Sequence, residues 1–416
     1  MKAFIRRLVP EPVLSAYHLL LARLGAYIYR FPSRRLTVIA VTGTKGKTTV
    51  VELIAAILRQ SGNRVASANT IQFCIGEDCE RNLYKMSTPG RFFLSRFLRR
   101  AVNAGCTHAV IELTSEAAKQ HRHAGVELDA LVFTNLQPEH LESHGGIKAY
   151  AAAKLSLARS LERSPKRPRI IVANRDDEYG EKFLEAAVER RVPFSLSDAE
   201  PYNSDEKSIR FVYKRGELFT VPLAGLFNVK NCLAALALGE ALGIPQAVMK
   251  HALEHVSRIA GRAERIEQGQ PFAAVVDYAH TPDSLRALLE TYRNKQIICL
   301  LGSTGGGRDK WKRPAMGKIA DEFCSAAILT NEDPYDEDPR GIVQDIAAGF
   351  TRQKPRIVLD RRTAIRSALA EAKDGDAVLI TGKGTDPYIM GPRGAREPWS
   401  DAQVVREELQ KLGYHY

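Results

Sequence analysis

At 416 residues, the chain is longer than one typical hydrophobic core supports, so we expect two domains with a short appendage. Its composition, 44% apolar and 26% charged, is typical of folded globular proteins and excludes a largely disordered or membrane-embedded chain. The net charge of +12 predicts anionic partners. Because no nucleic-acid-binding module is recognisable, phosphorylated substrates or an anionic membrane surface are favoured over nucleic acid.

Residues 1–36 form a basic, amphipathic segment. Apolar side chains recur every three or four residues on one face of a predicted helix: Leu14, Tyr17, Leu21, Leu24, Ile28 and Phe31. The positive charge comes from Arg6, Arg7, Arg23, Arg30, Arg34 and Arg35. The apolar run is too short to cross a bilayer and lacks a signal-peptide cleavage site. Two interpretations stay open: a helix docked on the protein's own surface, or peripheral contact of a cytoplasmic protein with the inner membrane face.

From Thr37 onward, short β-branched runs alternate with helical patterns, which indicates an α/β fold with parallel sheets. The first group of strands is "TVIAVT", "HAVIEL", "ALVFTN" and "RIIVAN". After "GRAERI" the pattern restarts with "FAAVVDYA", "QIICLLG", "AAILT", "RIVLD" and "AVLITG". We therefore predict a central nucleotide-binding domain over residues 37–260 and a Rossmann-like C-terminal domain over residues 261–416.

The stretch "TGTKGKTT" follows the first strand and precedes a helical pattern. Its glycines permit a tight turn, so the amides of residues 44–49 point toward phosphate oxygens at a helix N-terminus. Lys47 is expected between the β and γ phosphates, with the Thr48 hydroxyl on magnesium. Val41 replaces the first glycine of the standard phosphate-binding loop, yet strand, loop and helix lie in the required order. The predicted nucleotide contacts are Gly43, Thr44, Lys45, Gly46, Lys47, Thr48 and Thr49.

Two further groups follow strand ends. Glu112 lies where a parallel sheet presents ligands at its carboxyl edge, and His140 follows the next strand, beside Glu139. A neutral imidazole can bind a metal, although a single histidine in a loop is more often structural. From these residues alone, the metal site stays an open alternative.

The six cysteines are scattered along the chain, several of them inside apolar runs. We interpret them as reduced, buried thiols of a cytoplasmic protein. Cys74 and Cys79 have no second pair of cysteines nearby, so a zinc site is not expected.

Ten motifs occur in the order found in the Mur ligases, and the chain resembles that family over residues 37–416. They are "VTGTKGKTT", "MSTPG", "IELTSEAAKQHR", "FTNLQPEHLESHGGIKAYAAAK", "GLFNVKNCLAAL", "GRAERI", "VDYAHTPDSL", "GSTGGGRDKWKRPAMG", "LTNEDPYDEDP" and "GKGTD". The pattern is most similar to the MurE-type enzymes, which add the third amino acid to UDP-N-acetylmuramoyl-dipeptide.

The resemblance implies an ATP-dependent amide ligase of peptidoglycan precursor synthesis, in which a carboxylate becomes an acyl phosphate and an amine then displaces the phosphate. ATP and Mg²⁺ are the implied cofactors, and a muramoyl-dipeptide acceptor and an amino acid are the implied substrates. The implied catalytic residues are Lys47, Glu112, His140 and Lys154. Thr48, Glu112, His140 and Lys154 are the implied magnesium ligands, and Lys154 matches a lysine that is carbamylated in the family.

The remaining site residues are also implied by the resemblance. Further nucleotide contacts fall on Asn228, Asn231, Arg262 and Asp277. The acceptor-binding positions are Ser87, Thr88, Thr114, Ser115 and Arg122. The incoming amino acid is assigned to Arg308, which matches a carboxylate-binding arginine, to Glu332 and Asp333, and to Asp386, which stands near the incoming amine.

The sequence departs from the family pattern in two places. Where diaminopimelate-adding enzymes carry Asp-Asn-Pro-Arg, this chain carries Glu332, Asp333, Pro334 and Tyr335. Without that arginine, an amino acid with a distal amine, such as lysine, fits better, unless the two acids cap the following helix or another arginine takes its place. Only 36 residues precede Thr37, where the family has a uridine-binding domain. The acceptor is therefore either UDP-linked with few contacts or lipid-linked.

Two other functions stay open. A sibling ligase activity, such as folate polyglutamylation, is disfavoured by the MurE-like motifs. A catalytically inactive nucleotide-binding subunit is disfavoured by the retained Lys47, Glu112, His140 and Lys154.

Overall fold

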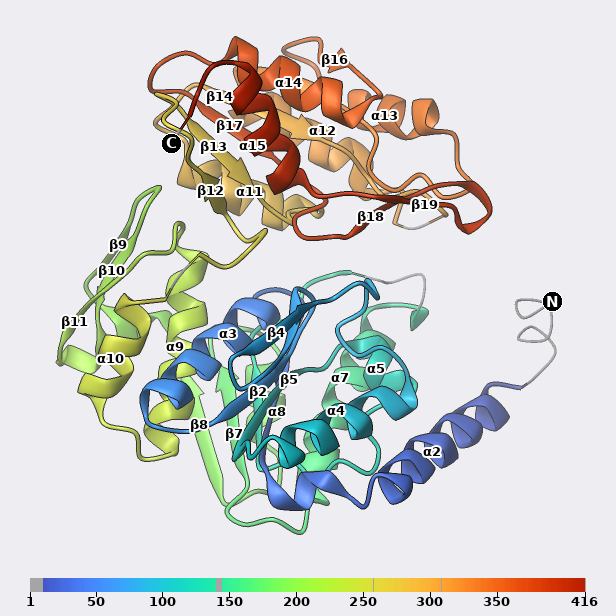
Figure 1. Cartoon of the computed structure of the whole chain (residues 1–416), viewed down its shortest axis with the longest axis vertical. Helices are drawn as coiled ribbons and strands as arrows, with labels where there is room; N and C mark the ends of the chain where they lie inside the picture. The colour runs from blue at the N-terminus through green and yellow to red at the C-terminus, as the bar shows by residue number, and fades with distance from the viewer. Residues whose placement is uncertain (1–9, 140–143, 257, 308, 416) are drawn as a thin grey trace.

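The computed structural model describes residues 10–139, 144–256, 258–307 and 309–415. It confirms the α/β class, with two sheet-containing units that face each other across a cleft (Figure 1). The first unit contains the chain up to α10, and the second begins at β12, just after Gly261.

An eight-stranded sheet forms the first unit, in the order β4-β3-β2-β5-β1-β6-β7-β8. β1 lies inside the sheet and pairs in parallel with β5 and β6, and only the β3–β4 edge is antiparallel. The strands are β1 (Thr37–Thr42), β2 (Val65–Ala68), β3 (Gln72–Ile75), β4 (Asp78–Arg81), β5 (His108–Glu112), β6 (Ala130–Phe133), β7 (Ile170–Asn174) and β8 (Arg190–Phe194).

Helices cover both faces of this sheet, which explains why its parallel strands are continuous apolar runs. On one face lie α3 (Lys47–Gln60), α9 (Phe227–Ala241) and α10 (Gln246–Glu254). The other face is covered by α4 (Arg91–Asn103), α5 (Ser115–Lys119), α7 (Ile147–Glu162) and α8 (Gly180–Leu184). A small antiparallel sheet follows β8, made of β9 (Tyr202–Ser204), β10 (Ile209–Val212) and β11 (Leu218–Val221).

The second unit is a six-stranded sheet in the order β12-β13-β17-β14-β15-β16. Its strands are β12 (Glu264–Ile266), β13 (Ala273–Val276), β14 (Ile297–Leu301), β15 (Ala326–Leu329), β16 (Arg356–Ile357) and β17 (Ala377–Ile380). One face carries α11 (Pro282–Thr291), α12 (Lys312–Phe323) and α13 (Pro339–Ala347), and the other carries α14 (Arg361–Glu371) and α15 (Asp401–Lys411). A hairpin of β18 (Tyr388–Met390) and β19 (Arg396–Pro398) precedes α15.

The N-terminal helix α2 (Glu11–Ile28) lies on the outside of the first unit, next to α4 (Figure 1). It buries His18, Ala22, Gly25 and Ala26. The apolar stripe that the sequence predicts as its packing face is instead half-buried or exposed, and Phe31 lies beyond the end of the helix. No helix in the described part of the chain combines the length and hydrophobicity needed to cross a bilayer.

The expectation of six reduced cysteines is wrong for one pair. Cys74 and Cys79 form a disulfide, because the antiparallel register of β3 and β4 places them directly opposite each other. The other four cysteines are buried free thiols, as expected: Cys106, Cys232, Cys299 and Cys324.

Candidate active site

The loop between β1 and α3 passes so close to its neighbours that two of its positions admit only glycine. Gly43 and Gly46 have φ angles of +147° and +82°, where other residues are strained. A Cβ atom on Gly46 would lie 2.2 Å from the Asn231 side-chain oxygen, and one on Gly43 would lie 2.0 Å from the Thr134 hydroxyl. The loop therefore leads tightly into the N-terminus of α3, which begins at Lys47 and favours anions there.

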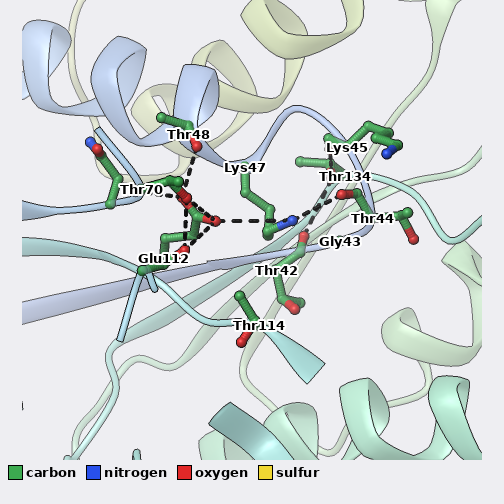
Figure 2. A network of polar contacts seen from close by, with 12 residues as sticks. Thr42, Gly43, Thr44, Lys45, Lys47, Thr48, Thr70, Glu112, Thr114 and Thr134 are labelled. Atoms are coloured by element: carbon green, nitrogen blue, oxygen red, sulfur yellow. Dashed lines mark hydrogen bonds and ion pairs between the residues drawn. The ribbon is translucent and has the colours of Figure 1, made fainter. Parts of the chain in front are cut away.

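Lys47 lies inside this loop, with its ammonium 2.9 Å from the Thr44 carbonyl oxygen and 4.0 Å from a Glu112 carboxylate oxygen. Figure 2 shows its side chain between the loop and Glu112. Burial lowers the pKa of Lys47, while the Glu112 carboxylate opposes that shift. A ligand phosphate in the loop would add a second anionic partner for this amine.

The carboxylate of Glu112 ends β5 and collects hydroxyl groups from three separate segments (Figure 2). Thr48 on α3 and Ser87 each donate to it at 2.8 Å. Thr70, between β2 and β3, lies 3.2 Å from both carboxylate oxygens. Glu112 is only 3% exposed, so these hydroxyl groups provide the hydrogen bonds that its buried carboxylate needs. The structure thus brings Glu112 and Thr48 together, as the sequence predicts.

Lys154 on α7 is 1% exposed, and its amine donates a 2.6 Å hydrogen bond to the Gly43 carbonyl oxygen. Burial, reinforced by the nearby positive charge of Lys47, holds the pKa of Lys154 well below the usual lysine value. Its amine is therefore the neutral, nucleophilic form far more readily than a surface lysine. It lies behind the phosphate-binding loop, not on the solvent-exposed face of the helix.

His140 lies outside the described residues, whereas its neighbour Glu139 is described. Glu139 forms an ion pair with Lys45 at 3.1 Å, and its carboxylate lies 2.8 Å from the Nε2 atom of His280. Burial lowers the pKa of His280 to about 4, so its imidazole is neutral at physiological pH. This contact joins the two units, because Glu139 belongs to the first and His280 to the second.

A cavity of about 1160 Å³ opens between the two units over this loop. Of the predicted site residues, Thr44, Lys45, Gly46, Lys47, Thr48, Thr49, Ser87, Thr88, Glu112, Thr114, Ser115, Arg122, Asn231, Arg262 and Asp277 line it. The phosphate-binding loop and the predicted acceptor positions therefore line the same cavity.

The second unit contributes Arg262 and Asp277 to the cavity wall. Arg262 reaches to 3.4 Å from the Thr48 hydroxyl, and its guanidinium lies 4.5 Å from the centre of the Tyr278 ring. Asp277 accepts hydrogen bonds from the amides of Ala263 and Ala279, while burial raises its pKa. Arg262 is thus placed to add positive charge at the nucleotide loop.

Asn228 and Asn231 lie in the first turns of α9. The Asn228 amide donates to the Ala224 carbonyl at 2.8 Å and accepts from the Asn231 amide at 2.8 Å. Asn231 lines the cavity, whereas Asn228 does not line it and instead accepts the hydrogen bond from Asn231. Neither is the N-cap residue of α9, which is Leu226.

The predicted acceptor positions lie together along one side of the cavity. Arg122 donates to the Thr88 carbonyl at 2.6 Å, which joins two of the predicted segments. Thr114 is also the N-cap of α5, and the Ser115 hydroxyl is 3.1 Å from His144 Nε2. These hydroxyls and the guanidinium form a polar wall that suits a carboxylate-bearing substrate.

The acids assigned to the incoming amino acid form a separate cluster with two lysines. Lys85 of the first unit is 2.5 Å from Asp333 and 2.8 Å from Asp386. Lys383 is 2.8 Å from Asp333 and 3.5 Å from Asp386. The Glu332 Oε1 atom accepts from Thr304, whereas its buried Oε2 atom has no hydrogen-bond partner among the described residues.

The alternative that Glu332 and Asp333 cap the next helix is wrong, because Asp338 caps α13. Arg308, the predicted carboxylate-binding residue, lies outside the described residues. Sequence reasoning did not assign Thr70, Lys85 or Lys383 to the site. Lys383 lies within "GKGTD", and Lys85 comes just before "MSTPG", so both were next to assigned residues. Thr70 had no pattern to mark it.

Two domain families match the chain: the Mur ligase middle domain over residues 41–239 and the Mur ligase glutamate ligase domain over residues 261–384. The chain belongs to the Mur ligase family. As its members are, it is an ATP-dependent ligase. The second match begins at Gly261, the residue that precedes Arg262 and its cavity contacts.

Individual proteins of the family cover most of the chain. The UDP-N-acetylmuramyl-tripeptide synthetase of Roseiflexus sp. (strain RS-1) is 38% identical over 98% of this chain and 85% of its own length. The UDP-N-acetylmuramoyl-L-alanyl-D-glutamate–2,6-diaminopimelate ligase of Syntrophomonas wolfei is 36% identical over 94% of this chain and 81% of its own. A solved ligase with the same descriptive name aligns with a TM-score of 0.64 at 29% identity, over 95% of this chain and 83% of its own.

Gly46→Ala is expected to weaken ATP binding by about tenfold or more, because its Cβ atom would meet Asn231 within the phosphate-binding loop. The matched control is Gly62→Ala. Gly62 has nearly the same φ angle, +84°, but nothing within 4 Å of a Cβ atom. Both variants carry the backbone strain, so titration with a fluorescent ATP analogue isolates the contact. Equal affinities in the two variants would contradict this account of the loop.

Proposed function

We propose that this Mur ligase joins an amino acid to the peptide carboxylate of a muramoyl-dipeptide acceptor, through an acyl phosphate, in peptidoglycan precursor synthesis. One observation carries the proposal: Glu112 links the nucleotide loop, through Thr48, to the predicted acceptor segment, through Ser87, in one cavity. The relatives named as tripeptide synthetase and diaminopimelate ligase support the same reaction class. The cytoplasm, which supplies ATP, is the proposed location.

The residues of the loop fit the triphosphate of ATP. Backbone amides at the start of α3 would bind its phosphates, and Lys47 and Arg262 would supply positive charge. Thr48 and Glu112 offer the hydroxyl and carboxylate oxygens that Mg²⁺ prefers, with His140 and Lys154 as the further proposed ligands. No group of three or more His, Cys, Asp or Glu side chains that would hold a metal alone occurs among the described residues. The few protein ligands, Thr48 and Glu112 among them, suit an ion that would also bind the phosphates of ATP. Mg²⁺ there would reduce the repulsion between ATP and the anionic acceptor.

Phosphorylation solves a chemical problem for the acceptor. A carboxylate is a poor acyl donor, because oxide is a poor leaving group, whereas phosphate leaves readily. The acceptor carboxylate attacks the γ-phosphorus, ADP departs, and the amine then attacks the carbonyl and expels phosphate. The protein's part is to hold two anions together and to deliver the amine. Arg122, Ser87 and Thr88 are placed to hold the acceptor while Lys47 neutralises the phosphate.

Lys154 is proposed to carry a carbamate. The neutral amine, favoured by burial, attacks carbon dioxide, and loss of a proton leaves an anion in place of an ammonium. An anion there would contribute to magnesium binding, whereas an ammonium would repel the ion. The close carbonyl of Gly43 also ties the position of Lys154 to the nucleotide loop.

The incoming amino acid is proposed to carry a distal amine. Asp333 and Asp386 already hold the ammonium of Lys85, so the cluster is complementary to a cation of that kind. Tyr335 provides no positive charge for a distal carboxylate at the position where diaminopimelate-adding enzymes carry arginine. Several relatives are named diaminopimelate ligases, but their identities of 33–37% leave the amino acid open.

The function is tested by incubating the protein with ATP, Mg²⁺, UDP-muramoyl-dipeptide and an equimolar mixture of amino acids. We expect phosphate release that requires both acceptor and amino acid, and a product mass equal to the acceptor plus lysine or a similar diamine. Phosphate release that depends on neither substrate, or no product at all, would favour a nucleotide-binding subunit without ligase activity.

Lys154→Ala is expected to abolish ligation, and added bicarbonate is expected not to restore it. The control is Lys148→Ala, an exposed lysine on the same helix, which should retain full activity. Carbon-13 NMR of the wild-type protein in labelled bicarbonate should show a carbamate signal that Lys154→Ala lacks. Unchanged turnover of Lys154→Ala would refute the assignment.

Tyr335→Arg should raise the ratio of diaminopimelate to lysine product by about tenfold, since it restores a guanidinium for the distal carboxylate. The ratio is measured by mass spectrometry with the two amino acids in competition. Tyr202→Arg on β9, an exposed residue that does not line the cavity, is the control for added charge. An unchanged ratio would place amino acid selectivity elsewhere in the cleft.

A further inference from the structure

Helix α2 buries one histidine and three small residues, and it exposes large apolar side chains. Its buried residues are His18, Ala22, Gly25 and Ala26. Its outer face, one stripe with helical spacing, consists of Val13, Tyr17, Leu20, Leu24, Tyr27 and Ile28, whose exposed fractions range from 44% to 71%. Scattered exposed apolar residues are normal, but a continuous exposed stripe of this kind indicates a surface that binds something.

The position of α2 is fixed by contacts close to the acceptor side of the cleft. The Ser15 hydroxyl lies 2.8 Å from Nε2 of His121, which stands between the cavity-lining residues Gln120 and Arg122. His18 contacts Arg91, which follows the acceptor segment that contains Ser87 and Thr88. The N-terminal half of α2 therefore contacts residues that adjoin the predicted acceptor positions of the cavity. The helix lies on the outside of the first unit (Figure 1).

Positive charge surrounds the outer face of α2. Residues 10–35 contain four arginines and one acid, Glu11, which pairs with Lys119. Arg23 and Arg30 are exposed on and just after the helix, and Arg96 is exposed on the adjacent α4. Glu127 pairs with Arg34, and Glu80 pairs with Arg100. The apolar stripe thus has a cationic border.

We propose that the outer face of α2 docks on the surface of an anionic lipid bilayer. An apolar face bordered by arginines, with tyrosines at Tyr17 and Tyr27, has the composition of helices that lie in the membrane interface. A two-fold contact between copies of the chain would bring the same arginine borders against each other, which favours lipid over self-association. Docking by this face would hold the acceptor end of the cavity at the headgroup layer.

This inference goes beyond the proposed function and does not require it. Membrane docking depends on α2 and its basic border, whereas ligation depends on the loop, Glu112 and the cleft. If the protein binds vesicles but does not ligate, the proposed function is refuted and the docking proposal stands. If it ligates but does not bind vesicles, the docking proposal is refuted and the proposed function stands.

The test is co-sedimentation of the full-length chain with vesicles of phosphatidylcholine, with and without phosphatidylglycerol. We expect binding that requires phosphatidylglycerol and weakens at high salt. The double variant Leu20→Gln and Leu24→Gln should lower the partition coefficient by about tenfold or more, because both side chains lose the apolar surface that the membrane would bury. A control double variant, Leu218→Gln and Leu412→Gln, alters exposed leucines far from α2 and should bind as the wild type does.

Three results would overturn the proposal. The first is an absence of binding to phosphatidylglycerol vesicles, and the second is equal loss of binding in the test and control variants. The third is a dimer detected by light scattering that the α2 variant abolishes, since it would make this face an interface between copies of the chain. Circular dichroism spectra and thermal unfolding midpoints equal to those of the wild type verify that both double variants are folded.

Discussion

The arrangement of the cleft depends on one buried carboxylate. Glu112 closes β5 and receives hydroxyl hydrogen bonds from α3, from the β2–β3 connection and from the segment before α4. A buried carboxylate needs such partners, because a buried charge without a partner lowers the stability of the fold by roughly 3–5 kcal/mol. The nucleotide loop and the acceptor segment are therefore held in register by the same group. Two lysines lie around it, Lys154 fully buried and Lys47 partly buried, and the pKa values of both are lowered.

The sequence predicts the buried half of the fold well and the exposed half poorly. β1, β5, β6 and β7 are enclosed on both faces, so apolar runs mark them. β4 is exposed at every residue and β9 likewise, so neither has an apolar run or a regular alternation to mark it. The Cys74–Cys79 disulfide has no signal in the sequence for the same reason, because it depends on the pairing of β3 with the exposed edge strand β4.

The candidate site divides in the same way between local and distant contacts. The nucleotide loop is contiguous, so its glycines and Lys47 could be recognised from order and spacing alone. The Lys85–Asp333 contact joins residues 248 positions apart and leaves no local signal. Periodicity predicted helix α2 but not which face it buries, because its packing uses alanine and glycine, whose small side chains carry little hydrophobic signal.

Lys85 occupies the two carboxylates, Asp333 and Asp386, that are proposed to bind the incoming amino acid. Although burial opposes it, the carboxylates of Asp386 and Asp333 raise the pKa of Lys85, so its ammonium persists across the physiological range. Because Lys85 belongs to the first unit and both acids to the second, this contact joins the two units. Under the proposed function, a substrate amine that binds these acids would compete with the ammonium of Lys85, whose effective concentration is set by the fold. Under the proposed function, binding of that amine and separation of the two units would be thermodynamically linked, because both break the ion pairs of Lys85.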